Sequence, residues 1–273
     1  MLRLTLFFLL ALSTSATAVV IRDDVNDAQY RAAASQFPQL VDLPTEGHGI
    51  LIAPQWVVTA AHAVAWQSKV DVVVVNGSPH RVEKVIFHAG YKKLPQALIS
   101  AAMKSGDATA TMEFLASSDD VALLKLVAPV NDVSPARIFR GATTGKQIQI
   151  LGKGATGTGA TGHHPHGPNR TDLRRAFSNV TTTKGRWLSY QFRRPPDALP
   201  LEGTAGNGDS GGPLLITQGE GWQLAGLTSW KHVEGNVADF RPGQYGNVNY
   251  AVRLAHYVDW IEATMTNEAA QPE

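Results

Sequence analysis

The sequence predicts an all-β protein, because short runs of β-branched and apolar residues alternate with turn residues from His48 onward. The first runs cover residues 49–52, 56–59, 70–75 and 82–87, and turns such as Asn76-Gly77-Ser78-Pro79 separate them. Hydrophobic residues make up 44% of the chain and charged residues 17%, a balance typical of folded globular proteins. The composition therefore excludes wholesale disorder and leaves the chemistry open.

Residues 1–18 have the pattern of a signal peptide. Arg3 gives a positive start, an apolar run follows from Leu4 to Leu12, and Ala16-Thr17-Ala18 matches the small-x-small pattern that a signal peptidase cleaves after. A membrane-spanning helix needs roughly 20 apolar residues, so this run is too short to be an anchor. We therefore expect a mature protein that begins at Val19, is secreted or periplasmic, and has no membrane contact after leader removal.

The expected first β domain spans residues 19–135. An alanine pattern at 27–36 predicts a short helix near its start. Residues 91–118 interrupt the strand pattern and are expected to form an insertion, with a helix at 94–104 and a loop at 105–118. The sequence pattern typical of β-strands resumes at 121–127, so the insertion is expected to lie between two strands of the β domain.

The expected second β domain spans residues 136–250. Its apolar runs lie at 147–151, 187–192, 213–217 and 223–230, and the segment 152–169, rich in Gly, Thr and His, predicts a long surface loop. Leu254, Tyr257, Val258 and Ile261 recur at i, i+3, i+4 and i+7. This spacing predicts a C-terminal helix, assigned to 251–266, followed by a frayed tail at 267–273.

The chain has a net charge of +1 and no cysteine. A nearly neutral protein has no strong field to attract nucleic acid, so no nucleic-acid partner is expected. The lack of cysteine excludes thiolate metal sites and cysteine nucleophiles, and the neighbouring His163, His164 and His166 match no firm ligand spacing. We therefore expect a monomer with no cofactor and no metal.

Three motifs stand in the order His, Asp, Ser along the chain. Thr59-Ala60-Ala61-His62 follows an apolar strand, and Asp120 directly precedes the buried run 121–126. The third motif is Gly208-Asp209-Ser210-Gly211-Gly212-Pro213, in which glycines let the backbone turn sharply and aim two N–H groups at one point. The hexapeptide is the most specific of the three, and order and spacing reinforce the other two.

These motifs resemble the signatures of the trypsin/chymotrypsin family of serine proteases. The similarity extends from about Val20 to Met265, because 226–230 resembles the strand that lines the family's substrate cleft and 250–261 resembles its C-terminal helix. The resemblance implies two six-stranded antiparallel Greek-key β-barrels, packed side by side, with a C-terminal α-helix. The first barrel would hold His62 and Asp120, and the second Ser210.

The resemblance also implies a role for each residue. Ser210 would attack a peptide carbonyl, His62 would take its proton and return it to the leaving amine, and Asp120 would orient and stabilise the imidazole. The N–H groups of Gly208 and Ser210 would form the oxyanion hole. The neighbouring Asp119 is expected to be solvated, because the family's aspartate stands directly before the strand. The other candidate bases lack a motif: His48, His80 and His88.

The proposed activity is therefore serine-type endopeptidase, with polypeptide substrates, and three alternatives were considered. Gly208-x-Ser210-x-Gly212 also fits the nucleophile elbow of α/β-hydrolases, but that fold places acid and histidine after the serine, and Pro213 opposes a helix there. A catalytically silent binding module would not need the complete set of three residues. An esterase acting on small acyl groups could use the same site.

The sequence also yields expectations for activation and specificity. In the family, a freshly cut apolar N-terminus pairs with the aspartate before the serine, here Asp209, and cleavage after Ala18 would expose Val19-Val20-Ile21. The expected substrate pocket comprises Thr204, Ser229, Trp230 and Lys231. Thr204 stands where trypsin-like enzymes carry an aspartate, so cleavage after basic residues is not predicted. Lys231 could narrow the pocket, favour an acidic group or point to solvent, the last being preferred, with apolar or medium-sized residues expected at the cleaved position.

Overall fold

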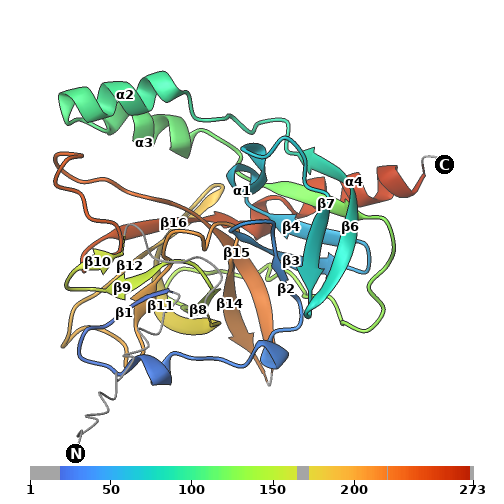
Figure 1. The fold of residues 1–273 in the computed structure, drawn as a ribbon, viewed down its shortest axis with the longest axis horizontal. Helices are drawn as coiled ribbons and strands as arrows, with labels where there is room; N and C mark the ends of the chain where they lie inside the picture. Colours follow the sequence, from blue (N-terminus) through green and yellow to red (C-terminus); the bar gives the residue numbers. More distant parts are fainter. Residues whose placement is uncertain (1–18, 165–171, 220, 271–273) are drawn as a thin grey trace, which may run out of the picture.

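Two closed six-stranded antiparallel β-barrels form most of the chain, and a helix follows them (Figure 1). The computed structural model describes residues 19–164, 172–219 and 221–270; the expected leader and the last residues of the tail lie outside these ranges. The first barrel consists of β2 (Leu40–Asp42), β3 (His48–Ala53), β4 (Trp56–Thr59), β5 (Val72–Val75), β6 (Ser78–Phe87) and β7 (Ala122–Leu126). The second consists of β8 (Gln147–Gly152), β11 (Arg174–Lys184), β12 (Trp187–Gln191), β14 (Pro213–Gln218), β15 (Gly221–Lys231) and β16 (Val248–Arg253).

The two barrels have the same topology. Their strands are ordered β2-β3-β4-β7-β6-β5 and β8-β11-β12-β16-β15-β14, so in each barrel the first three strands are neighbours and the fourth closes against the first. This is the Greek-key order, in which one strand returns by a long connection to lie beside the first. The predicted all-β, chymotrypsin-like architecture is therefore confirmed.

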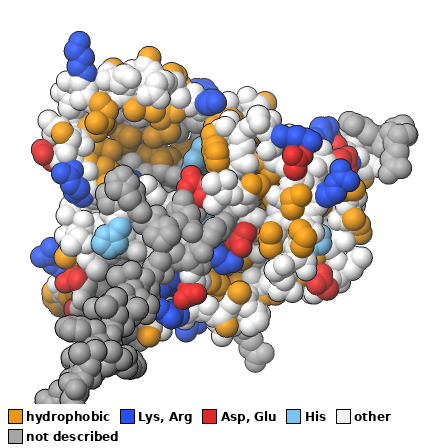
Figure 2. Space-filling view, in the orientation of Figure 1, with side chains coloured by type: hydrophobic (Ala, Val, Ile, Leu, Met, Phe, Trp, Pro, Cys, Tyr) orange, Lys and Arg blue, Asp and Glu red, His pale blue; other side chains and the backbone are white. Residues whose placement is uncertain are grey.

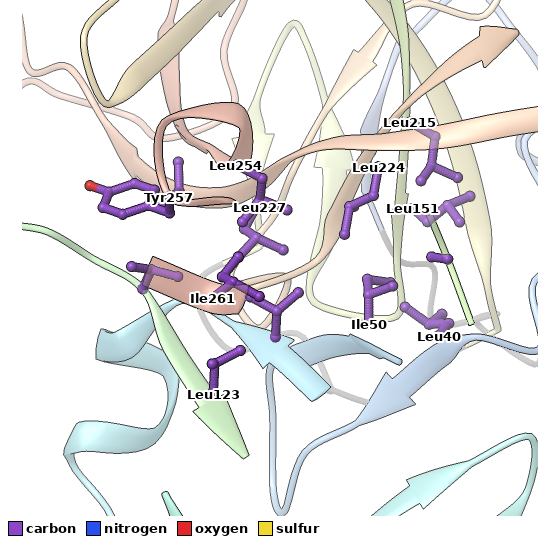
Figure 3. Packing of buried hydrophobic residues seen from close by; sticks show 14 of the residues in the cluster. Leu40, Ile50, Leu123, Leu151, Leu215, Leu224, Leu227, Leu254, Tyr257 and Ile261 are labelled. Atoms are coloured by element: carbon purple, nitrogen blue, oxygen red, sulfur yellow. The ribbon is translucent and has the colours of Figure 1, made fainter. Parts of the chain in front are cut away.

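A shared hydrophobic core joins the barrels to each other and to the C-terminal helix (Figure 3). The first barrel contributes Ile50 and Leu123, and the second contributes Leu215 and Leu227, all at most 1% exposed. Ile261 of the helix α4 (Val258–Ala269) packs into the same core. Burial of apolar surface at about 25 cal/mol per Å² makes this contact a major source of cohesion between the barrels.

The insertion contains two helices, α2 (Gln96–Ser105) and α3 (Thr109–Ala116), which project as a hairpin beyond the barrels (Figure 1). The prediction of a loop at 105–118 was therefore wrong for most of its length. Gly106 ends α2 in the left-handed conformation, and the Asp107 carboxylate accepts the backbone N–H of Thr109 at the start of α3. A glycine cap followed by an aspartate is a start and stop signal for helices.

Other boundaries also differ from the sequence expectations. Residues 251–253 belong to β16, where Ala251 pairs with Leu188 and Thr228, so the C-terminal helix begins later, at Val258, and extends to Ala269. The expected helix at 27–36 is instead two short 3₁₀ turns, at Asp27–Gln29 and Ala34–Gln36. Tertiary pairing overrides local propensity in such short segments.

The segment expected to be a long surface loop partly joins a small sheet. Its β9 (Thr156–Thr158) and β10 (Gly162–His163) pair with each other, and β9 lies parallel to β1 (Val19–Ile21). On its other side β1 pairs with β13 (Gly203–Thr204), so the sheet has the order β10-β9-β1-β13. The sheet thus holds the segment that follows the expected leader against the chain that leads to Ser210.

A buried arginine fixes the segment after β1. Arg174 is fully buried and donates two hydrogen bonds to Asp27, of 2.7 and 2.9 Å, in a fork geometry. We expect Asp27→Ala to lower the free energy of unfolding by about 3 kcal/mol, because it leaves a buried guanidinium without its carboxylate. Urea denaturation measures the change. Glu262→Ala, which breaks the exposed pair with Arg140, is the control and should cost less than about 1 kcal/mol; equal effects would contradict the argument.

Candidate active site

Barrel pairing brings His62 beside Asp120. Strands β4 and β7 are antiparallel and Thr59 pairs with Ala122, so the segment after β4 meets the segment before β7. His62 lies in α1 (Ala61–Ala65), and the fully buried Ala60 and Ala61 allow the backbone to pack tightly at this corner. The small residues of the motif thus place the imidazole at the strand end.

Asp120 holds the ring of His62 in one orientation. The carboxylate is buried, accepts the backbone N–H of His62 at 2.8 Å, and lies 2.7 Å from Nδ1 of the ring. An ionised carboxylate can only accept, so Nδ1 carries the proton and Nε2 presents a lone pair. Ser229 on β15 also donates its hydroxyl to Asp120, which ties the second barrel to the same group.

Nε2 of His62 faces the hydroxyl of Ser210. The two atoms are 2.7 Å apart, so His62 bridges Asp120 and Ser210 in one hydrogen-bonded chain. The Ser210 turn is fixed against the first barrel, since Gly47 and His48 donate their N–H groups to the carbonyls of Gly208 and Ser210, at 3.0 and 2.8 Å. The structure therefore brings together the three residues that the sequence nominated, from both barrels.

The glycines of the hexapeptide are required by this geometry. A Cβ on Gly211 would lie 2.2 Å from the His48 carbonyl oxygen, and Gly208 has a φ of +83°, which side chains rarely adopt. The N–H groups of Gly208 and Ser210 make no hydrogen bond to any residue that the structure describes. Two such donors beside the serine hydroxyl can receive the oxygen of an attacked carbonyl.

Asp120 also sets the pKa of His62. Burial lowers the pKa of the imidazole, but the charge of Asp120 and its hydrogen bond outweigh burial, so the net pKa is raised above its ordinary value of 6.5. The charges of Glu46 and Lys231 act in opposite directions and contribute less. The ring is thus a stronger base than a solvated histidine, as proton removal from a hydroxyl requires.

Asp209 lies beneath the serine and is fully buried. Its carboxylate accepts the N–H of Gly154 at 2.7 Å and of Gly206 at 2.8 Å, and His48 Nε2 lies 3.8 Å away. Hydrogen bonds of this kind orient the turn, but a buried carboxylate is most stable beside a positive charge. No lysine or arginine of the described residues lies within 4.0 Å of it.

The expected pocket residues lie on β13 and β15. Thr204 on β13 is fully buried, with its hydroxyl 3.5 Å from that of Tyr190, so this position is uncharged. Trp230 stacks on Tyr250 with ring centroids 4.0 Å apart. Lys231 is half-buried rather than solvent-exposed, and burial lowers the pKa of its ammonium to about 8.

Asp119 is not solvated, contrary to the expectation. Its carboxylate accepts the hydroxyl of Tyr257 at 2.7 Å and pairs with Arg186 at 3.1 Å and with His88 at 3.4 Å. The side chain is only 13% exposed. Asp119 thus links β7 to the C-terminal segment and the second barrel, a structural role that leaves Asp120 for His62.

An apolar recess beside His62 was not foreseen from the sequence. It has a volume of about 160 Å³ and lies between the triad residues His62 and Asp120 and the root of the insertion, with Tyr91, Leu94, Leu115 and Trp230 in its walls. Figure 2 shows hydrophobic side chains gathered in a hollow below the α2–α3 hairpin. Leu94 and Leu115 are apolar residues of the insertion, and their apolar character was the one sequence feature that could have indicated this recess.

Two further observations concern other predicted features. Among residues 19–164, 172–219 and 221–270, no group of three His, Asp or Glu side chains is placed to hold a metal ion, and His166 lies outside these ranges. In the same residues no helix is long and apolar enough to span a membrane.

Paired Greek-key barrels with a histidine, an aspartate and a serine joined across their junction define a serine-protease type of fold and site. The family model for trypsin matches residues 28–261. The match covers both barrels and the first turn of the C-terminal helix, and the chain belongs to the trypsin family.

Proposed function

We propose that the protein is an exported serine endopeptidase in which Ser210 is the nucleophile, His62 the general base and acid, and Asp120 the group that orients His62. The observation that carries the proposal is the unbroken hydrogen-bonded chain from Asp120 through His62 to Ser210, with both ring contacts at 2.7 Å. Export rests on the leader pattern of residues 1–18.

The reaction follows from the positions of the donors and acceptors. As the Ser210 oxygen bonds to the peptide carbonyl carbon, its proton moves to Nε2 of His62, and the N–H groups of Gly208 and Ser210 receive the oxyanion. His62 then protonates the amine as the C–N bond breaks, which leaves an acyl group on Ser210. A water molecule, deprotonated by His62, attacks this ester and releases the acid.

An extended peptide can be positioned by the open edge of β15. Beyond Leu227 the strand no longer pairs with β14, and residues 229–231 have only β16 as a neighbour in the described chain. A substrate strand that adds to this edge would place a carbonyl at Ser210 and a side chain in the recess beside His62. Polypeptides are therefore the proposed substrates.

Labelling with a fluorophosphonate probe tests the proposal. The probe should modify the wild type covalently and fail to modify Ser210→Ala or His62→Ala, whereas Ser178→Ala, which changes a buried serine of β11, should label normally. A wild type that resists the probe would favour a silent binding module. Labelling accompanied by hydrolysis of small esters but no peptide would favour an esterase.

The activity should fall at low pH as His62 becomes protonated. Because the pKa of His62 is raised, the protonated form persists to higher pH, so the acid limb of kcat/KM should have its midpoint above 6.5. Measurement of kcat/KM between pH 5 and 9 gives the midpoint. Glu46→Gln removes a charge that raises the pKa of His62, so it should move the midpoint slightly lower; a wild-type midpoint below 6.5 would contradict the assignment.

A further inference from the structure

Lys231, one of the expected pocket residues, lies on β15 two residues after Ser229, whose hydroxyl donates to Asp120. Trp230 stacks on Tyr250 and lines the apolar recess, so the next residue, Lys231, leaves β15 on the opposite face, directly across from Asn249. Three residues earlier on the same strand, Thr228 exchanges two backbone hydrogen bonds with Gly211 and Gly212 of the Ser210 turn, at 2.9 and 2.8 Å. Lys231 therefore lies on the strand segment that continues from the Ser210 turn.

The ammonium has no carboxylate partner within the described residues. No Asp or Glu of those residues lies within 4.0 Å of its Nζ, although the side chain is half-buried. A cation that is largely removed from water is unfavourable unless an anion or hydrogen-bond acceptors replace its hydration. The pocket therefore favours a ligand that brings a negative charge.

Two neighbouring polar atoms are also unsatisfied. Nδ1 of His163 on β10 and Oδ1 of Asn249 on β16 are buried and make no hydrogen bond with the described residues. The Asn249 oxygen can accept one ammonium proton and so orient Lys231, while the remaining ammonium protons and the His163 ring can donate to one ligand. Buried polar atoms without partners at a site are typical of a ligand position.

We propose that Lys231, with His163, binds the carboxylate of the substrate residue whose carbonyl Ser210 attacks, so that the protein cleaves after glutamate or aspartate. This specificity rests on the proposed endopeptidase function. Thr204 is buried and uncharged, so it offers no negative charge to a basic side chain. A substrate carboxylate would supply the anion that no Asp or Glu of the described residues supplies to Lys231.

Four peptides that differ only at the cleaved residue, Glu, Gln, Leu or Lys, test the specificity. We expect kcat/KM for the Glu peptide to exceed that for its neutral isostere Gln by about 10²-fold, as for a partly desolvated charge pair. Lys231→Met keeps the length of the side chain without its charge and should abolish this ratio. Lys69→Met, on the surface of the first barrel, is the matched control and should preserve the ratio.

Binding in the absence of turnover separates this proposal from the proposed function. In the Ser210→Ala background, isothermal titration calorimetry should show the Glu peptide bound more tightly than the Gln peptide, and Lys231→Met should remove the difference. His163→Gln should weaken only the Glu peptide, by about tenfold. Equal binding of Glu and Gln peptides, or preferential cleavage after Leu or Lys, would overturn the acidic pocket even if the probe labels Ser210. If the fluorophosphonate probe does not label the wild type, the proposed endopeptidase function is contradicted instead.

Discussion

Ser210→Ala should lower kcat for a peptide substrate by about 10⁶-fold while leaving the fold intact. In the proposed mechanism this hydroxyl is the nucleophile, since its oxygen lies 2.7 Å from Nε2 of His62. A water molecule attacking in its place lacks the effective concentration of a held nucleophile. Burst and steady-state kinetics at saturating substrate measure the loss.

The double variant gives the stronger test of a shared mechanism. Because Ser210 and His62 act as one unit, Ser210→Ala/His62→Ala should lose no more than about as much as either single variant. Asp120→Asn should cost about 10⁴-fold, since the amide favours the wrong imidazole tautomer. Losses that multiply would show that the three side chains act independently, against the hydrogen-bonded chain seen here.

The candidate site could be predicted from the sequence because each of its residues His62, Asp120 and Ser210 lies in a short local motif. The small residues before His62, the apolar strand after Asp120 and the glycines around Ser210 are all readable without knowledge of distant contacts. Gly211 illustrates the physical reason: only the absence of a Cβ allows the turn to approach the His48 carbonyl. The two-barrel fold was predicted from the resemblance of these motifs to the trypsin/chymotrypsin family.

The features that were missed depend on residues far apart in the chain. Asp119 was expected in solvent because its partners Tyr257 and Arg186 are distant in sequence, and only folding brings them to it. Lys231 was expected in solvent for the same reason, since its partial burial depends on the pairing of β15 with β16, where Lys231 lies opposite Asn249. A local sequence pattern indicates where a helix or strand runs and where it ends. Whether a charged side chain is buried depends on tertiary contacts.

The second large effect concerns Val19, the residue that leader removal is expected to expose as the N-terminus. Val19 and Val20 are fully buried, and β1 holds Val19 opposite Thr156, two residues after Gly154, whose N–H bonds to Asp209. Val19 also has a φ of +64°, an unfavourable conformation for a β-branched residue, which costs of the order of 1–3 kcal/mol. Hydrolysis of the bond before Val19 removes the preceding carbonyl, and with it this strain.

We therefore expect a mature form that begins at Val19 to be active, and a form with one alanine retained before Val19 to lose activity by at least about 10²-fold. The new ammonium is the cation that the buried Asp209 needs, and an added residue displaces it, leaving an unpaired buried carboxylate worth about 3–5 kcal/mol. Titration of active sites with the fluorophosphonate probe, on N-termini verified by mass spectrometry, measures the active fraction. Asp209→Asn should lose activity with either N-terminus, whereas alanine added after Glu273 should have no effect. Full activity of the extended form would show that Asp209 is satisfied by its N–H donors alone, in which case leader removal serves only export.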